Sequence, residues 1–329
     1  TGFIQAEANG GLLFDTVFSD NTITDRSLVR VKNDNALQYL RNREGLFHQS
    51  YNLINRENDS LYSGWLMNLA LEHRFSYLRQ SYVYTDIPGF NTPEPLLQSN
   101  STLDSTAFEQ VRNALGVSID GQYSASGHLW LETSSNEGVN YRNIQNNLGL
   151  DFQFETVFSE RFPLSSKLTY VLQGVRQGGL DLYAETGFRN KGFEFIPYAQ
   201  LTRAFPGFQP SRYTSNYRAW NNEFAIMTRT SFGLKLRQSF LGEVNFSAMR
   251  WDAPVYYDIA AFPLQTNNAS GLFRLSWHSS YSWGILRLDN RMVWQVADEN
   301  DPFIQVPDLY LREVLYIEFS LFNTALDFQ

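Results

Sequence analysis

Long segments of this chain alternate between apolar and polar residues, and this pattern limits the possible fold more than any other feature. A period of two is that of a β-strand, whose successive side chains point to opposite faces. The clearest alternating rows begin at Trp65, Val111, Leu148, Leu180, Ile226, Phe273 and Leu315. The positions between the apolar residues carry mostly Ser, Asn, Gln, Asp, Glu and Arg. Each segment therefore predicts a strand with one apolar face and one polar face.

The number and length of these segments point to a particular kind of β-protein. We count roughly 13–15 of them, each of about 9–15 residues, whereas strands of soluble proteins most often have about 5–6. Strands this long and this numerous are typical of membrane-spanning β-barrels. We predict an all-β fold, an antiparallel transmembrane β-barrel of roughly 14 or more strands, with residues 1–329 forming a single domain. A large soluble β-sandwich is the alternative that period two leaves open.

The connections between the segments fit the same fold. Two are tight, at Gln177–Gly179 and Tyr281–Gly284. Three others are long and polar, at Ser19–Gly45, Thr85–Ser105 and Phe205–Asn222. Membrane barrels have short turns at one end and long loops at the other. We expect this asymmetry here.

Aromatic residues make up 16% of the chain, although its mean hydropathy is only −0.34. Alternation reconciles the two values, because one face of each strand would meet lipid and the other water. Many rings lie near segment ends, where barrels place aromatic girdles. They are Tyr77, Tyr82, Tyr84, Phe158, Phe162, Tyr198, Phe205, Trp251, Tyr256, Tyr257, Trp283 and Trp294. No apolar stretch approaches the ~18 residues that a transmembrane helix needs.

Several classes of function are excluded or disfavoured by composition. The chain has no cysteine, so it has neither disulfides nor thiolate chemistry. Its formal net charge of −8 disfavours nucleic acid as a partner, because phosphate contacts need a surplus of Lys and Arg. Its four histidines are not in the spacing of a zinc site. We therefore expect no cofactor and no metal.

A catalytic site finds little support in the sequence. His73 and His278 lie near Ser76 and Ser280, the pairing that a barrel lipid hydrolase would use, but triads are recognised by geometry rather than by spacing. The acidic run Asp298–Asp301 offers oxygen ligands for Ca²⁺ but lacks the EF-hand pattern. We expect a solvated turn at that run and no enzyme activity.

The polar faces supply the candidate functional residues. Inside a barrel, mixed acidic and basic side chains line a polar and selective passage, or pair across neighbouring strands and close it. The predicted pore-lining residues are Arg112, Asp120, Asp151, Glu155, Glu185, Glu194, Arg229, Lys235, Arg237, Glu243, Arg274, Arg291 and Glu318. The sequence does not decide between an open and a closed passage.

Several motifs resemble one known family. They are Asn9–Gly11, Gly45–Leu53, Tyr217–Phe224, Leu288–Gln295 and Val306–Tyr316. Together these elements are similar to the putative-porin family of Bacteroidota outer membranes. The resemblance implies a location in the bacterial outer membrane, in contact with its lipid and lipopolysaccharide. It also implies further strands at both ends, so that this chain would be an incomplete barrel; Phe328 is penultimate, where barrels usually end on an aromatic residue.

The resemblance leaves three functions open. The first is a porin-like channel for passive diffusion of small hydrophilic solutes, including ion transport. The second is a non-conducting structural subunit of an outer-membrane secretion or surface complex, with outer-membrane protein partners or further copies of the chain. The third is a barrel lipid hydrolase. The triplets Asp15–Val17, Asp59–Leu61 and Asp104–Thr106 also have the form of O-glycosylation sites in that phylum and lie near predicted loops.

Overall fold

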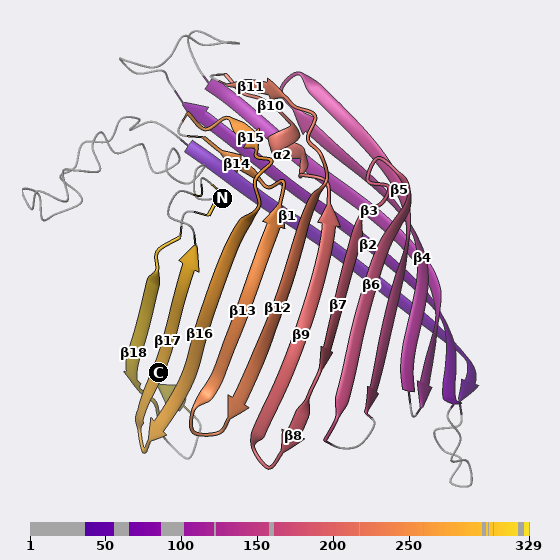
Figure 1. Ribbon diagram of the computed structural model, residues 1–329. Helices are drawn as coiled ribbons and strands as arrows, with labels where there is room; N and C mark the ends of the chain where they lie inside the picture. Colours follow the sequence, from indigo (N-terminus) through magenta and orange to yellow (C-terminus); the bar gives the residue numbers. More distant parts are fainter. Residues whose placement is uncertain are drawn as a thin grey trace, which may run out of the picture.

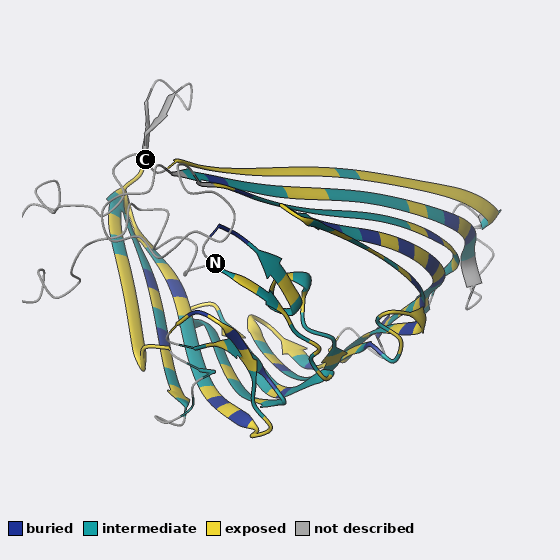
Figure 2. Cartoon of the chain, turned by 90° about the horizontal axis from the view of Figure 1, so that it is seen from above, coloured by how far each residue is buried: buried dark blue, intermediate teal, exposed yellow. Residues whose placement is uncertain are grey.

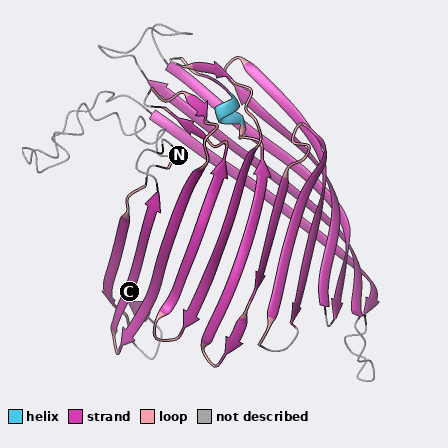
Figure 3. Cartoon of the chain, viewed as in Figure 1, coloured by secondary structure: helices cyan, strands magenta, loops and turns pink. Residues whose placement is uncertain are grey.

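The computed structural model describes residues 37–55, 66–86, 102–121, 123–157, 161–216, 218–258, 260–297, 301, 303–304, 306–321 and 326–328. Nearly all of them form antiparallel β-structure, with one short helix (Figure 3). The 14-stranded main sheet contains β1 (Leu37–Asn55), β2 (Leu66–Asp86), β3 (Thr102–Gly121), β4 (Tyr123–Gly138), β5 (Tyr141–Val157), β6 (Pro163–Gly174), β7 (Leu180–Thr186), β8 (Phe188–Asn190), β9 (Phe193–Ala204), β12 (Met227–Gln238), β13 (Gly242–Asp252), β16 (Ser270–Trp283), β17 (Leu286–Ala297) and β18 (Leu309–Ile317). The all-β antiparallel prediction is thus confirmed.

The remaining elements are short. They are the helix α2 (Phe208–Ser211) and three two-stranded pairs, β10 (Arg212–Thr214) with β11 (Ala219–Asn221), β14 (Val255–Tyr257) with β15 (Pro263–Gln265), and β19 (Phe319–Leu321) with β20 (Leu326–Phe328). The helix and the first two pairs lie together at one end of the main sheet (Figure 1). No helix among the described residues is long and apolar enough to cross a membrane.

The main sheet follows the chain as an antiparallel meander, except that β7 pairs with β9 and the short β8 pairs only with β9. The register confirms the alternation, since directly opposed residues share a face and the apolar rows of neighbouring strands meet: Leu115 lies opposite Leu129, and Leu129 opposite Leu150. The sheet is strongly curved (Figure 2). No pairing joins β1 to β18 in the described part of the chain.

The connections are asymmetric, as expected. At one end, called here the short-turn end, compact turns lie at residues 191–192, 239–241 and 284–285. At the opposite, long-loop end, residues 205–226 join β9 to β12 and residues 253–269 join β13 to β16. Two tight turns are exceptions, because they lie at the long-loop end: residues 139–140 connect β4 to β5, and the turn at Gln177–Gly179 connects β6 to β7.

The predicted loop Ser19–Gly45 is wrong over its last part, because β1 already begins at Leu37. Residues such as Arg41 and Glu44 read as loop because they are polar on both faces. They nevertheless pair with Ser81 and Leu78 of β2. The first three strands have 19, 21 and 20 residues, longer than the segments counted from the sequence. Polar strand ends carry no alternation, so the sequence pattern shortens them.

Candidate functional site

The face of the sheet that lines the inside of the curve is fixed by contacts with α2. The long-loop elements lie within the curve when the sheet is seen from above (Figure 2). There the ring of Phe208 packs against that of Phe108 on β3, at a centroid distance of 5.4 Å. Phe108 therefore belongs to the inner face, and the register carries this assignment from strand to strand.

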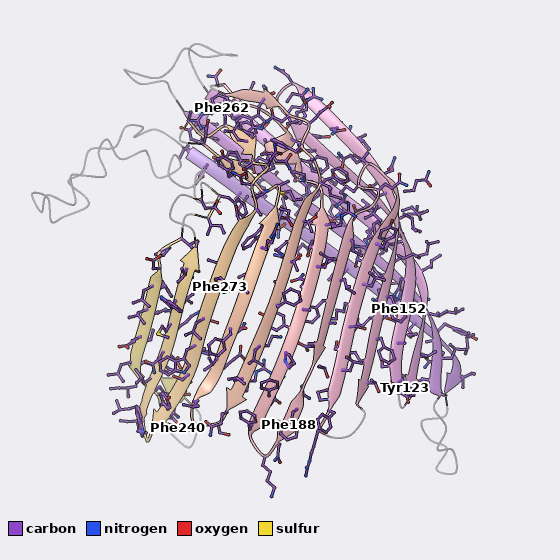
Figure 4. All side chains as sticks on the ribbon, viewed as in Figure 1. Tyr123, Phe152, Phe188, Phe240, Phe262 and Phe273 are labelled. Carbon is purple, nitrogen blue, oxygen red and sulfur yellow. The ribbon has the colours of Figure 1, made fainter. Side chains whose placement is uncertain are left out.

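The two faces have opposite chemistry, in the inverse of a soluble protein. On β4 the outward Leu129 and Leu131 are 50% and 62% exposed, whereas the inward His128 and Glu132 are only 3% and 5% exposed. Outward rings occur at mid-height, as at Phe152 and Phe273 (Figure 4). Apolar residues therefore face the surroundings, and polar residues face the enclosed side.

Rings also gather at the short-turn end, where Figure 4 shows Tyr123, Phe188 and Phe240. The ring of Phe240 approaches Tyr281, and Tyr281 stacks on Trp283 at 5.7 Å. This is the arrangement of an interfacial girdle. Several of the predicted girdle residues do not belong to one, however. Tyr256 and Tyr257 lie in β14, outside the main sheet. Tyr82, Tyr84, Tyr198 and Trp251 have inner-face register positions.

The predicted pore-lining residues lie on one face. By register, all those within strands are on the inner face, and Glu318 directly follows β18, where it accepts a hydrogen bond from Arg287 Nε at 2.6 Å. Seven of these residues belong to three groups of contacting side chains. Arg112 and Asp151 belong to the first, Glu185 and Lys235 to the second, and Glu194, Arg237 and Glu243 to the third.

The first group is centred on the carboxylate of Asp151. It receives Arg112 Nη2 at 2.6 Å, Trp130 Nε1 at 3.2 Å and Thr169 Oγ1 at 2.8 Å. The Arg112 guanidinium also lies 4.1 Å from the centre of the Trp130 ring, a cation–π distance. Four strands, β3 to β6, are thereby linked along the inner face.

Next to this group, the buried Glu132 accepts a hydrogen bond from Gln110 Nε2 at 2.7 Å and pairs with Arg176 from the β6–β7 turn. Burial lowers the pKa of Arg176, and the nearby charge of Arg112 lowers it further. Neither Glu132 nor Arg176 is among the predicted pore-lining residues. Glu132 could have been found from strict alternation with Leu129 and Leu131, whereas Arg176 lies in a turn and carries no such signal.

The second and third groups cross the opposite wall. Lys235 Nζ donates to Glu185 at 3.0 Å and to the Tyr183 hydroxyl at 3.1 Å. Towards the short-turn end, Arg237 bridges Glu194 at 3.2 Å and Glu243 at 2.7 Å. Opposite charges thus pair between neighbouring strands at Arg237 and across the intervening β9 at Lys235 and Glu185. These contacts brace the wall and leave charged groups along the inner face.

The other predicted residues stay outside these groups. Asp120 accepts from the backbone of Gly121, and Glu155 accepts from Gln153. The buried Nε atoms of Arg229 and Arg274 have no hydrogen-bond partner among the described residues. Arg291 lies opposite both His278 and Arg312. The inner face therefore has a cationic patch near β17, formed by Arg291 and Arg312, with Asp289 beside it.

Glycines directly opposite aromatic rings shape the inner face, a feature that the alternation of a single strand does not predict. His128 lies over Gly116, Trp130 over Gly149, and Tyr198 over Gly233, each pair in direct register. Without a Cβ, the glycine lets the opposite ring lie flat on the sheet. In the first pair, this allows His128 Nε2 to reach Glu72 on β2, at 2.9 Å across β3.

Gly116 provides a test of this packing. A Cβ there would overlap the carbonyl oxygen of Gly127 and lie 2.5 Å from His128 Cδ2. We expect Gly116→Ala to lower the free energy of unfolding by about 1–3 kcal/mol in urea titrations in lipid vesicles, because overpacking displaces the ring. Gly127→Ala is the matched control, since its nearest neighbour would be Phe152 at 4.0 Å. Equal losses in both variants would contradict the assignment.

The long-loop end carries a compact unit, called here the cap, formed by the described residues of 205–226 and 253–269. Trp220 is at its centre, stacked on Tyr213 at 4.7 Å and in edge contact with Tyr257 and Phe262. Gln265 joins the two loops through hydrogen bonds to the backbone of Ala225. Burial raises the pKa of Tyr257.

The cap is tethered to the opposite wall. The backbone amide of Asn216 donates to Asp104 on β3 at 2.6 Å, and both residues are buried. The Tyr141 hydroxyl of β5 donates to the carbonyl of Arg212 at 3.1 Å. The cap therefore reaches across the space enclosed by the sheet. Asp104–Thr106 lies within β3 rather than in a loop, whereas Asp15–Val17 and Asp59–Leu61 fall outside the described residues.

The catalytic arrangements considered above are not found among the described residues. His73 is on the outer face, 3.4 Å from Asn113, and Ser76 is on the inner face. The Ser280 hydroxyl donates to Asp289 rather than to His278. No cluster of His, Asp and Glu in the described part could hold a metal ion. In the run Asp298–Asp301 only Asp301 is described, and it accepts from the backbone of Phe303.

An antiparallel curved sheet with an apolar outside and a charged inside defines the membrane β-barrel class. The chain belongs to the family described as "Putative porin", which it matches over residues 2–329. Among solved structures it is similar to one titled "Copper transporter OprC", with a TM-score of 0.53 and 12% sequence identity. That match covers 84% of this chain and 50% of the other, so this chain spans half of that structure's length. No curated protein matches the chain.

Proposed function

We propose that this chain forms a channel of the bacterial outer membrane for passive diffusion of small hydrophilic solutes. The inverted polarity of the sheet is the observation that carries the proposal. Adjacent residues on β4 illustrate it, since Leu131 is 62% exposed on the outside and Glu132 5% exposed on the inside. An exposed apolar exterior requires lipid around it, and a charged interior requires water.

The inner-face charges give such a channel its selectivity. Acidic and basic groups alternate across β9, β12 and β13, and the cationic patch near β17 adds positive charge. Lipid and lipopolysaccharide would contact the outward apolar rows. Small solutes would pass along the inner face and around the cap.

Two measurements test the channel. A folded barrel resists unfolding by detergent, so the unheated protein should migrate differently from the heated protein on a detergent gel. The same folded sample should produce stepwise single-channel currents in planar lipid bilayers. Folded protein that never conducts would exclude the channel.

The cap favours a second candidate function, a non-conducting barrel that serves as a structural subunit. The buried contact between Asp104 and Asn216 holds the cap across the enclosed space. This function predicts silent bilayers for the wild-type protein. It also predicts co-purification with outer-membrane partners, or with further copies of the chain, in constant ratio.

Charge removal at Arg237 tests whether ions pass along the inner face. Arg237→Ala leaves Glu194 and Glu243 without their shared cation. Glu194 keeps its contact with Arg189 Nε at 3.2 Å, whereas Glu243 loses its arginine. We expect the K⁺/Cl⁻ permeability ratio to rise about twofold, because an uncompensated carboxylate attracts cations. Reversal potentials in a KCl gradient measure it.

Arg250→Ala is the matched control for this prediction. It removes the same charge from the outer face, where Arg250 pairs with Asp252 at 2.8 Å. We expect its permeability ratio to equal that of the wild type. Equal shifts in both variants would contradict passage along the inner face.

A further inference from the structure

A cavity of about 850 Å³ lies at the long-loop end, between the inner face of the first strands and the part of the cap around α2. Its walls come from β1 to β5 on one side and from residues 207–213 on the other, segments far apart in the sequence that meet at the top of Figure 1. Cavities that hold small organic ligands have volumes of roughly 300–1,000 Å³. The space is thus of the size of a ligand site.

Five aromatic side chains line the cavity. They are Tyr82, Phe108, Tyr141, Phe208 and Tyr213. Several are fixed by their neighbours: Phe108 packs on Phe208, Tyr213 stacks on Trp220, and the Tyr141 hydroxyl accepts from Asn136 at 3.2 Å. Rings that are already ordered lose little conformational entropy when a ligand binds.

The polar groups of this cavity are uncharged. Amide side chains of Gln38, Gln80, Asn136 and Gln209 line it, and none of the described lining residues is Asp, Glu, Lys, Arg or His. An amide both donates and accepts hydrogen bonds, which suits hydroxyl groups. An ion would lose its hydration here without a counter-charge, at a cost of several kcal/mol. The cavity therefore differs from the charged inner face described above.

We propose that this cavity binds a short neutral saccharide. The apolar C–H face of a sugar ring fits on an aromatic ring, and its hydroxyls pair with the amides. Charged sugars are disfavoured because the lining residues are uncharged. If the cavity takes up a solute before the solute passes through the barrel, the inference rests on the proposed channel. As a binding site, it does not require an open passage.

Calorimetric titration of the folded, detergent-solubilised full chain tests the site. The neutral probes are maltotriose, cellotriose, mannotriose and triacetylchitotriose, and the charged probe is trigalacturonate. We expect at least one neutral trisaccharide to bind and trigalacturonate not to bind at the same concentrations. Phe208→Leu keeps an apolar side chain but removes the ring, and should weaken binding at least about tenfold. Gln209→Ala, which removes an amide from α2, should weaken it as well.

Phe152→Leu is the matched control for the loss of a ring, because Phe152 is on the outer face (Figure 4). Its affinity should equal that of the wild type. Adenosine serves as an uncharged aromatic probe that is not an oligosaccharide. The proposal is overturned if no neutral trisaccharide binds, or if trigalacturonate or adenosine binds more tightly than every neutral trisaccharide. It is also overturned if Phe208→Leu and Gln209→Ala both leave the affinity unchanged. Bilayer currents separate the two inferences: binding without conductance removes the channel and retains the site, and conductance without binding does the reverse.

Discussion

Replacing residues 205–226 with an Asn-Gly turn should raise the single-channel conductance at least about twofold, because the first half of the cap then no longer crosses the enclosed space. Ala204 and Met227 are directly opposed at the ends of β9 and β12, so a two-residue hairpin turn can join the strands without shifting their register. Single-channel currents in planar bilayers give the result.

The control for this variant lies at the other end of the sheet. Replacing residues 239–241 with Asn-Gly changes a connection of the short-turn end that has no part in the cap, and should leave the conductance unchanged. A folded, heat-modifiable variant that lacks residues 205–226 and conducts like the wild type would contradict the role of the cap. If the wild-type protein is silent and the shortened variant conducts, the cap is a plug rather than a constriction.

The buried tether provides a milder form of the same change. In Asp104→Ala the amide of Asn216 loses its acceptor, which costs about 1–3 kcal/mol when the amide remains buried. The cap would then detach from β3 for part of the time, and currents should fluctuate between two levels. Asp104→Asn keeps an acceptor oxygen and should fluctuate less.

The fold was largely predictable because each side chain in a strand faces one of two solvents, lipid or water. Leu129 and Leu131 meet the apolar surroundings, whereas His128 and Glu132 meet the enclosed side. Where a strand has lipid on one side and water on the other, its sequence therefore alternates with a period of two. Beyond that part of the strand, as at Arg41 and Glu44, both faces are polar and the same strand resembles a loop.

The aromatic rings show why residue type alone is a weaker guide. Trp283 lies on the outer face, whereas Tyr198 and Trp251 lie on the inner one, and only their positions in the register distinguish them. Tyr198 covers the strand at Gly233 directly opposite. Such a pairing depends on which residues of two distant segments face each other, and the sequence of one strand does not contain that information.

The candidate site was predictable as a face but not as a set of contacts. Alternation places Arg112 and Asp151 on the same side of their strands, yet their pairing depends on the side chains reaching each other across β4. The cap was even less predictable from the sequence. Its loops carry no period, and its contacts, such as Asn216 with Asp104, join positions that are 112 residues apart.

The largest change in stability is expected on the outer face, where Phe152→Arg should lower the free energy of unfolding in lipid vesicles by about 2–4 kcal/mol. Phe152 is 46% exposed and lies at mid-height on β5, where a guanidinium would have to enter hydrocarbon (Figure 4). Gln153→Arg is a matched control on the next residue. Its side chain points inward and donates to Glu155 at 2.8 Å, so the arginine would meet water and a carboxylate. Urea titrations should show a large loss for the first variant and little for the second. Similar losses in both would mean that the two faces are not in different solvents, and would contradict a membrane-spanning sheet.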